Sequence, residues 1–384
     1  MTNEVKNVPE VRFPEFKNEW ATTHLKDLGN FTSGGTPLKK KKAYWNGDIP
    51  WLTTGDINGK EIHKANNYIT QEGMENSSAK LINKEAILIA MYGQGKTRGM
   101  ASIINFEATT NQACAIFQTN NDIKFIHQLF RKDYYKLRSL SNDGSQKNLS
   151  LSLLKNYKIV VPEIEEQRKI GGFFNKLDRQ IELEEQKLEK LEEQKKGYMQ
   201  KIFSQELRFR DESGKDYLEW EEKNLMQIAK VKTGSKNVQD NIAGGKYEFF
   251  DRSVEIKHLN TFDFDETAII YPGEGSKFLP RFFSGKYSLH QRAYSIYNIN
   301  INNNYLYYYL ALQNNHFLKY AVGSTVKSLR MSGFDKLKVL VPESDEQEKI
   351  GYLFKKLDNL IVKQSNKIEV LKERKKALLQ KMFV

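Results

Sequence analysis

The chain carries one stretch twice: VPEIEEQRKIGG at residues 161–172 and VPESDEQEKIGY at residues 341–352. The likeness extends further along the chain. Aligned without a gap, 22 of the 43 positions from 161 to 203 are identical to the positions 180 residues later. Because unrelated segments do not match at that frequency, we interpret the chain as containing a duplicated unit.

Each copy continues as a run in which core-type positions recur three and four residues apart. This spacing predicts a narrow apolar seam and therefore a coiled coil, with the surrounding Glu and Lys residues facing solvent. Pro162 and Pro342 cannot lie inside a helix, so each helix is predicted to begin just after its proline. The residues predicted to pair the helices are Leu177, Ile181, Glu184, Leu188, Leu191, Lys195 and Ile202 with Leu357, Ile361, Gln364, Ile368, Leu371, Lys375 and Leu378.

Polar residues within the two seams predict the direction of pairing. In a parallel, in-register pair Lys195 would lie against Lys375, which places two like charges in one seam. An antiparallel register places Glu184 opposite Lys375 and Lys195 opposite Gln364, so that polar residues meet one another. Because polar pairs in a seam can specify register, we predict antiparallel helices in this register.

The duplication covers more than the helices. The recurring residues near the start of each half are Trp20, Leu25, Leu28 and Gly34, which return as Trp220, Leu225, Ile228 and Gly234. Each half then has an apolar run ending in a glycine-rich turn, at Ala86–Gly93 and Ala268–Gly273, as is typical of strands. We therefore predict an α+β protein with a pseudo-two-fold internal repeat. Its predicted parts are two similar mixed α/β domains at 1–160 and 205–340, joined by long helices at 161–204 and 341–384.

Charge and cysteine content limit the class of protein. The net charge is +12, and no single basic tail explains it, so the chain suits a polyanionic partner. The single cysteine, Cys114, excludes a disulfide framework and indicates a reducing compartment. The first residues lack an apolar signal region, and no run approaches the length of a membrane span. We expect a cytoplasmic protein without a membrane association.

Two short motifs suggest catalysis, and neither is well supported. Ala90–Thr97 fits a relaxed phosphate-binding pattern, but Gly99–Phe106 alternates like a strand and does not open a helix. Asp240, Glu255 and Lys257 have the spacing of a metal-dependent nuclease, yet the pattern occurs often by accident. The chain carries no methyltransferase motif either, so we expect a non-catalytic protein that binds no metal and no cofactor. The alternatives that stay open are a metal-dependent nuclease, an NTPase, or a coiled-coil adaptor without a DNA role.

Basic and polar residues near loops are the candidates for DNA contact. Lysines of this kind suit phosphates, which fix position without reading sequence, whereas Gln and Arg can hydrogen-bond base edges. A solvated loop is the alternative interpretation of the lysines. The candidate residues are Lys39, Lys40, Lys41, Lys42 and Tyr44 in one loop, Gln94, Lys96 and Arg98 on the first glycine turn, and Lys277 and Arg281 near the second.

The arrangement as a whole resembles the specificity subunit of Type I restriction-modification enzymes. The likeness rests on the doubled unit, with Arg-Phe, Trp and Leu at its head, a glycine-rich strand turn, and Gly-Ser (Gly144-Ser145, Gly323-Ser324) before a short strand. It also rests on Val-Pro-Glu-x-x-Glu-Gln-x-Lys-Ile-Gly, which opens each long helix, and it covers nearly the whole chain.

The resemblance implies a division of labour. The two domains would be target-recognition domains, each reading one half of a split site in double-stranded DNA. The helices would set the gap between the halves and dock two methyltransferase subunits. S-adenosylmethionine, ATP and Mg²⁺ would bind to the methyltransferase and restriction (motor-nuclease) subunits and not to this chain. Because recognition domains vary greatly within the family, the resemblance assigns no base-reading residue.

Overall fold

The computed structural model describes residues 7–93, 96–140 and 148–384, and it divides into two compact units. Unit 1 comprises Met1–Glu185 with Asn366–Val384, and unit 2 comprises Gln186–Ser365. The division from sequence treats each long helix as a separate part, whereas each compact unit contains half of both helices. No helix in the described part of the chain combines the length and apolar character that a membrane span requires.

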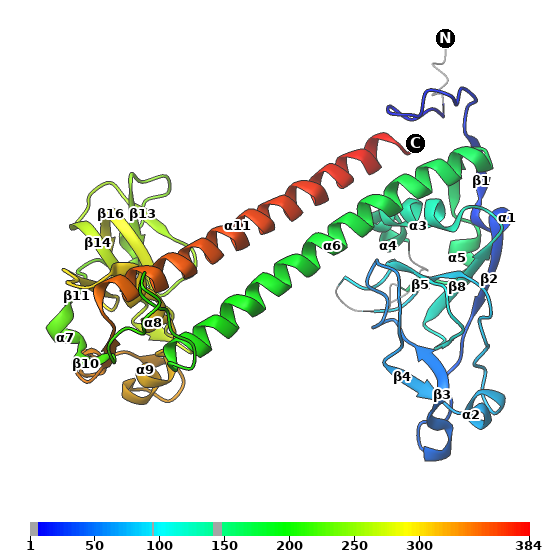
Figure 1. Ribbon diagram of the computed structural model, residues 1–384. Coiled ribbons are helices and arrows are strands. Elements are labelled where there is room, and N and C mark those ends of the chain that lie inside the picture. The colour runs from blue at the N-terminus through cyan, green and yellow to red at the C-terminus, as the bar shows by residue number, and fades with distance from the viewer. Residues whose placement is uncertain (1–6, 94–95, 141–147) are drawn as a thin grey trace, which may run out of the picture. The chain divides into compact units, whose positions relative to one another are not determined.

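Unit 1 is built on a four-stranded antiparallel sheet in the order β2-β8-β5-β6. A smaller sheet, β4-β3-β7, and the ladder β1-β9 complete its strands (Figure 1). The strands are β1 (Ala21–His24), β2 (Gly29–Ser33), β3 (Trp45–Leu52), β4 (Asn67–Ile69), β5 (Ala86–Ala90), β6 (Ala101–Ile104), β7 (Thr109–Thr110), β8 (Cys114–Thr119) and β9 (Lys158–Val161). The helices are α1 (Leu25–Leu28), η1 (Lys42–Tyr44), α2 (Gln71–Glu75), α3 (Ile123–Lys132), α4 (Tyr134–Ser139) and α5 (Leu151–Lys155).

Alternation along β5 gives this sheet two buried faces. Ile87 and Ile89 pack on one face with Phe125 of α3, whereas Leu88 on the other face packs with Leu52. All five residues of β5 are buried. The sheet is therefore the centre of unit 1, with the helices on one side and the β3 region on the other.

Unit 2 is built on a six-stranded sheet in the order β11-β17-β14-β16-β12-β13. Its pairs are antiparallel except β12 with β16. The strands of the unit are β10 (Glu221–Asn224), β11 (Lys230–Thr233), β12 (Tyr247–Phe250), β13 (Lys257–Leu259), β14 (Phe264–Tyr271), β15 (Glu274–Gly275), β16 (Arg281–Leu289), β17 (Tyr294–Tyr297), β18 (Lys327–Ser328) and β19 (Lys338–Val341). The helices are α7 (Leu225–Ile228), η2 (Val238–Asp240), α8 (Asn303–Ala311), α9 (Asn314–Tyr320) and α10 (Met331–Asp335).

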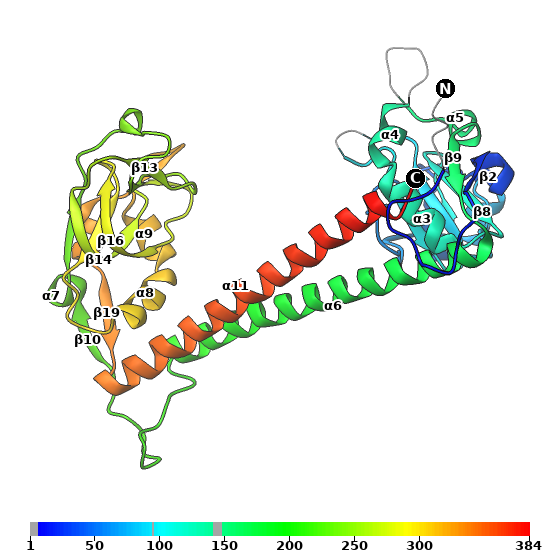
Figure 2. The same ribbon diagram turned by 90° about the horizontal axis from the view of Figure 1, so that it is seen from above.

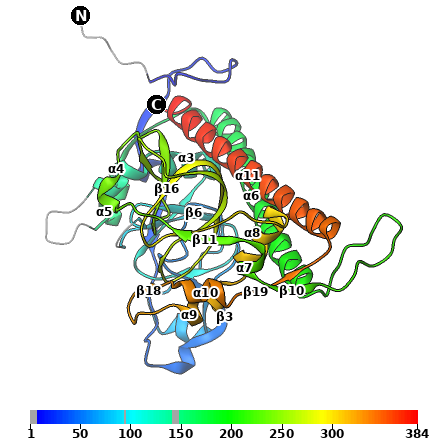
Figure 3. The same ribbon diagram turned by 90° about the vertical axis from the view of Figure 1, so that its left-hand side faces the viewer.

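The two long helices are α6 (Ile164–Phe203) and α11 (Ser344–Lys381), and each begins two residues after its proline, as predicted. Within each unit the segments of the two helices run antiparallel and lie side by side (Figure 2, Figure 3). In unit 1, Phe174 of α6 contacts Phe383, just beyond the end of α11, with ring centroids 5.9 Å apart. In unit 2, Phe203 of α6 contacts Phe354 of α11 at 5.8 Å. These two contacts are one pair under the 180-residue repeat, and they confirm the predicted pseudo-two-fold architecture.

The repeated motif anchors the head of each half. Arg12 forms an ion pair of 2.7 Å with Glu166, and Arg208 forms one of the same length with Glu346. Both glutamate side chains are fully buried. Short strands lie beside each pair: β1 pairs with β9 from Ala21↔Val161, and β10 pairs with β19 in the same register from Glu221↔Val341.

The glutamine and glycine of the motif join each long helix to a helix of its domain. The Gln167 amide donates to the Pro162 carbonyl (2.9 Å), and its oxygen accepts from the backbone N–H of Asp122, which caps α3. A Cβ at position 171 would lie 2.1 Å from Asp122 Oδ1, so only glycine allows this approach. Gln347 and Gly351 repeat these contacts at Asn302, the cap of α8. The motif therefore specifies how helix and domain meet.

Candidate nucleic-acid interface

The lysine loop of unit 1 presents its charges to solvent. Lys39, Lys40, Lys41 and Lys42 are all exposed. Lys41 Nζ donates a 2.8 Å hydrogen bond to the Tyr44 hydroxyl, and this bond raises the pKa of Lys41. Three lysines of the loop therefore project freely enough to meet phosphates, while the fourth lies against an aromatic side chain.

Tyr44 lies differently from the sequence-based expectation of a DNA-contacting aromatic. Tyr44 is 2% exposed. It ends η1, and its backbone carbonyl accepts a hydrogen bond from Thr70 N–H and lies close to Gly73. A buried ring offers no face to a base. Its contribution is the hydroxyl that holds Lys41.

The first glycine turn is anchored on α4. The Tyr134 hydroxyl donates to the Lys96 carbonyl (2.5 Å), and Arg98 Nη2 donates to the Arg138 carbonyl (3.1 Å). The Lys96 side chain is exposed, whereas Arg98 is half-buried. Gln94, the third residue predicted on this turn, lies outside the described residues, as do Gly144 and Ser145.

Residues of the two motifs that suggest catalysis make structural contacts. The strand β6 follows the glycine turn, so no helix N-terminus stands where a phosphate-binding loop requires one. In the second motif, Lys257 Nζ pairs with Asp251, and Asp240 caps the backbone N–H of Asn237. Among the described residues no group of three or more His, Cys, Asp or Glu could hold a metal ion. Burial raises the pKa of the Cys114 thiol to about 12, which makes it a poor nucleophile.

Near the second glycine turn, the two predicted residues have different surroundings. Lys277 is exposed between β15 and β16. Arg281 begins β16 and is half-buried, and its Nη2 donates to the carbonyl of Ser253. Arg281 therefore holds the loop after β12 in place, and its guanidinium faces the protein.

The predicted helix-pairing residues lie on the protected faces of α6 and α11. All fourteen are buried or half-buried, and Ile181, Ile202, Leu357, Gln364, Ile368 and Lys375 are fully buried. Tyr198, at a seam position of the first helix, is 40% exposed. The spacing in sequence thus places the seam where the helices are protected from solvent.

The two seam lysines form ion pairs with aspartates that the sequence did not predict. Lys375 Nζ pairs with Asp178 in unit 1, and Lys195 Nζ pairs with Asp358 in unit 2. Each aspartate lies six residues before the predicted partner, Glu184 or Gln364, and Glu184 pairs with Lys367. Aspartate is favoured because each one also receives a donor from the domain: Arg131 contacts Asp178, and the Tyr308 hydroxyl donates to Asp358. For Lys195 the aspartate also neutralises the ammonium, which the predicted amide partner Gln364 could not.

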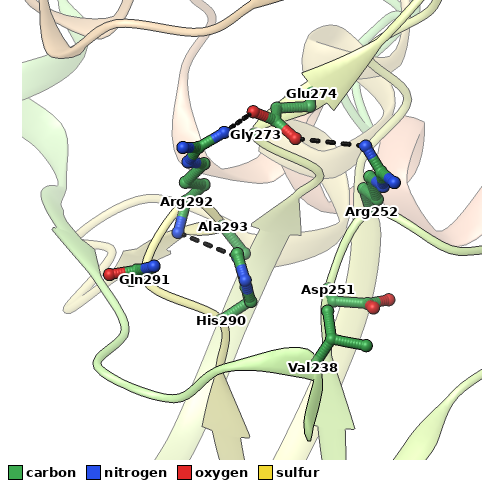
Figure 4. Close-up of a pocket in the computed structure, with 9 residues that line it drawn as sticks. All are labelled: Val238, Asp251, Arg252, Gly273, Glu274, His290, Gln291, Arg292 and Ala293. Carbon is green, nitrogen blue, oxygen red and sulfur yellow. Dashed lines mark hydrogen bonds and ion pairs between the residues drawn. The ribbon is translucent and has the colours of Figure 1, made fainter.

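A cluster in unit 2 was not predicted from sequence. Arg252, Glu274 and Arg292 meet at a pocket of about 270 Å³ (Figure 4). The sequence carries one signal, the likeness of His290–Ala293 to Thr110–Ala113, although the strand pairing aligns Arg292 with Ala113. The three residues are far apart along the chain, so the sequence does not show that they are neighbours. They become neighbours because the ends of β12, β14 and β16 lie together in the fold.

Comparison with known proteins agrees with the repeat. The sequence matches the family described as Type I restriction modification DNA specificity domain over residues 17–193 and again over 217–373. The specificity subunit of the Type I restriction enzyme MjaIX from Methanocaldococcus jannaschii is 26% identical over 417 residues, covering 97% of this chain and 94% of that protein. The EcoDI specificity subunit of Escherichia coli is 30% identical over 151 residues, covering 39% of this chain and 33% of that one.

A solved structure has the same fold. The crystal structure of the S subunit of the Type I restriction-modification system from M. genitalium superposes with a TM-score of 0.67 at 16% identity, covering 98% of this chain and 99% of that chain. Both copies of the repeat match the family, and the match extends over most of the chain. The chain therefore belongs to the family of DNA specificity subunits of Type I restriction-modification systems.

Proposed function

We propose that this specificity subunit recognises a bipartite site in double-stranded DNA, with each domain reading one half. The observation that carries the proposal is the repeat: the two halves share the same helix-anchoring contacts, Arg12–Glu166 and Arg208–Glu346. The exposed side chains at the strand ends differ between the halves, as expected if the two domains recognise different DNA sequences. The helices between the domains set the length of the unread gap.

Assembly with partner subunits uses the outer faces of the long helices. Apolar side chains lie exposed there, away from the seam, and such residues favour protein contacts. The most exposed are Leu183, Tyr352, Leu360, Val362 and Val370. Four of these residues lie on α11 and one on α6. The pseudo-two-fold repeat of the helices themselves suits two methyltransferase subunits, with restriction subunits joining the complex.

The chain itself performs no chemistry under this proposal. Two observations support this view. A strand, β6, follows the turn that resembles a phosphate-binding loop, and Lys257 of the nuclease-like motif forms an ion pair with Asp251. S-adenosylmethionine, ATP and Mg²⁺ then bind to partner subunits, and the contribution of this chain to the reaction is the choice of DNA site.

Methylome sequencing tests the proposed function directly. Cells that express this chain with its methyltransferase partner should carry methylation at a motif of two short specified segments separated by a fixed unspecified gap. Cells lacking only this chain should lose that motif. An unbroken motif, or one that persists without the chain, would contradict the proposal.

A further inference from the structure

The unpredicted pocket in unit 2 lies where three strands of the large sheet end. Its lining residues, which Figure 4 labels, come from the segments after β12, β14 and β16 and from η2. Asp251 and Arg252 follow β12, Gly273 and Glu274 follow β14, and the turn His290–Ala293 follows β16. Loops at the end of a rigid sheet are the usual carriers of binding residues.

A single carboxylate holds two arginines at this pocket. Arg252 Nη1 lies 3.4 Å from Glu274 Oε2, and Arg292 Nη1 contacts Glu274 Oε1. The Glu274 side chain is 12% exposed, whereas those of Arg252 and Arg292 are 64% and 63% exposed. The hydrogen bond from Arg292 lowers the pKa of Glu274, so the carboxylate is ionised at neutral pH. The cluster carries two positive charges and one negative charge.

The backbone beneath the arginines is rigidly defined. A Cβ at position 273 would lie 1.2 Å from the Arg292 carbonyl oxygen, so the turn and the strand end approach as closely as glycine allows. His290 Nδ1 accepts from the backbone N–H of Arg292 at 3.2 Å, and Ala293 is buried. The turn is thus anchored by its backbone and its inner side chains, and the Arg292 side chain projects outward.

The first domain has the same backbone arrangement with other side chains. A Cβ at Gly34 would lie 2.0 Å from the Thr110 carbonyl oxygen, and one at Gly234 would lie 1.9 Å from the Leu289 carbonyl oxygen. The strand pairs Ser33↔Ala115 and Thr233↔Tyr294 continue this match, so Arg292 takes the place that Ala113 has in the first domain. The two domains keep the same backbone at this position but carry different side chains. Such a position could give the two domains different DNA sequence specificities.

Arginine at such a position suits guanine. Its guanidinium can donate two parallel hydrogen bonds to O6 and N7 of guanine in the major groove. Within the described part of the chain, Glu274 is the side-chain partner of Arg252 and Arg292, through Nη1 of each. The other donors of each guanidinium remain available, and the shared carboxylate reduces the entropy lost when the arginines are ordered on DNA.

We propose that Arg252 and Arg292 each read a guanine in the half-site of the second domain, and that Glu274 positions both side chains. This inference rests on the proposed function of the chain and extends it to named bases and residues. Arg281, which donates to the Ser253 carbonyl, supports the loop that carries Arg252.

Single variants assembled with the partner subunits test the proposal by methylome sequencing. Arg252→Ala and Arg292→Ala should each relax one guanine position in the second half-site and leave the first half and the gap unchanged. Competition binding with duplexes altered at that guanine should show a loss of about 5- to 150-fold in discrimination. Glu274→Ala should weaken discrimination at both guanines, and Glu274→Gln should do so less, whereas a merely structural role would lower thermal stability without altering the motif.

The matched control is Arg210→Ala. Arg210 also forms an exposed ion pair, with Asp216 at 3.1 Å, and lies away from the pocket residues in the chain. This variant should keep the wild-type motif. If a variant abolishes methylation altogether, the competition assay on the purified complex decides the matter.

Three results would overturn the inference. They are a second half-site without any G·C pair, an unchanged motif in both arginine variants, and equal discrimination by variant and wild-type complexes. Each of these leaves a split wild-type motif in place, so the proposed function would stand. The absence of a split motif in the wild type would instead contradict the proposed function itself.

Discussion

At the scale of single residues, the buried glutamates of the repeated motif depend on their arginine partners. Glu346 is fully buried, and its partners are Arg208 and the indole N–H of Trp220, which donates to Oε2 at 2.9 Å. Removing the cation leaves an uncompensated charge in the interior, which costs more than the intact pair contributes. This cost explains why both halves have a glutamate with an arginine partner at this position, Glu166 with Arg12 and Glu346 with Arg208.

We expect Arg208→Ala to destabilise the protein by about 3–5 kcal/mol. Urea unfolding followed by tryptophan fluorescence measures the effect, since Trp220 adjoins the pair. Arg210→Ala, two residues away, removes an exposed pair with Asp216 and should cost no more than about 1 kcal/mol. Equal unfolding midpoints for the two variants would show that the buried pair has no special role.

Lys375 gives a prediction about pH. Burial, assisted by the nearby Arg131, lowers the pKa of Lys375 to about 8, below its usual 10.5. Between these values the unfolded chain binds more protons than the folded chain, so the cost of burying the ammonium falls as the pH rises. The stability of the wild type relative to Lys375→Met should therefore increase between pH 8 and pH 10. Urea unfolding of both proteins at several pH values measures this difference, and a constant difference would refute it.

The same lysine shows what a heptad pattern cannot predict. The pattern correctly identified Lys375 as a seam residue, because periodicity reports which face of a helix is buried. It assigned Glu184 as the partner, yet the ammonium reaches Asp178. A lysine side chain spans more than a helical turn, and the choice of carboxylate depends on Arg131 and Gln128 of α3, which also contact Asp178. Those contacts depend on tertiary structure.

At the scale of elements, the lysine loop is expected to position DNA without reading it. Lys39, Lys40 and Lys42 are exposed, whereas Lys41 holds Tyr44. Replacing Lys39, Lys40 and Lys42 by Ala in the assembled complex should weaken binding to cognate and unrelated duplexes alike. The slope of log K against log salt should become shallower by up to about 0.9 for each phosphate that the loop no longer neutralises. Weaker binding confined to the cognate duplex would mean that the lysines read bases.

The elements themselves were predictable to different degrees. The long helices and the repeat followed from heptads and internal identity, and the strand after the first glycine turn followed from its alternation, since β6 begins at Ala101. The pocket of Arg252, Glu274 and Arg292 was not predictable, because Arg252 and Arg292 lie in loops, Glu274 begins β15, and other strands separate the three along the chain. A local sequence pattern predicts a single helix or strand. A site formed by the ends of several strands depends on the order of the strands in the sheet, which a local pattern does not predict.

At the scale of the whole molecule, the duplication gives each unit the same construction from different parts of the chain. In unit 1 the backbone N–H of Val11 donates to the Lys381 carbonyl at 2.9 Å, and Phe383 stacks on Phe125 at 5.1 Å. In unit 2 the matching place is taken by Phe203, which packs on Tyr305 and Phe354. Each recognition domain is therefore completed by the end of one helix and the start of the other, which makes the domains separate modules.

Exchange of one domain is the most direct test of this modularity. Residues 1–160 would be replaced by those of a related specificity subunit, and the methylome of cells expressing the hybrid with its partner subunits would be sequenced. Because each domain has its own anchoring contacts and the helices are retained, one half of the methylated motif should change while the other half and the gap stay the same. A change in both halves, or in the length of the gap, would contradict the proposal that the two domains read DNA independently.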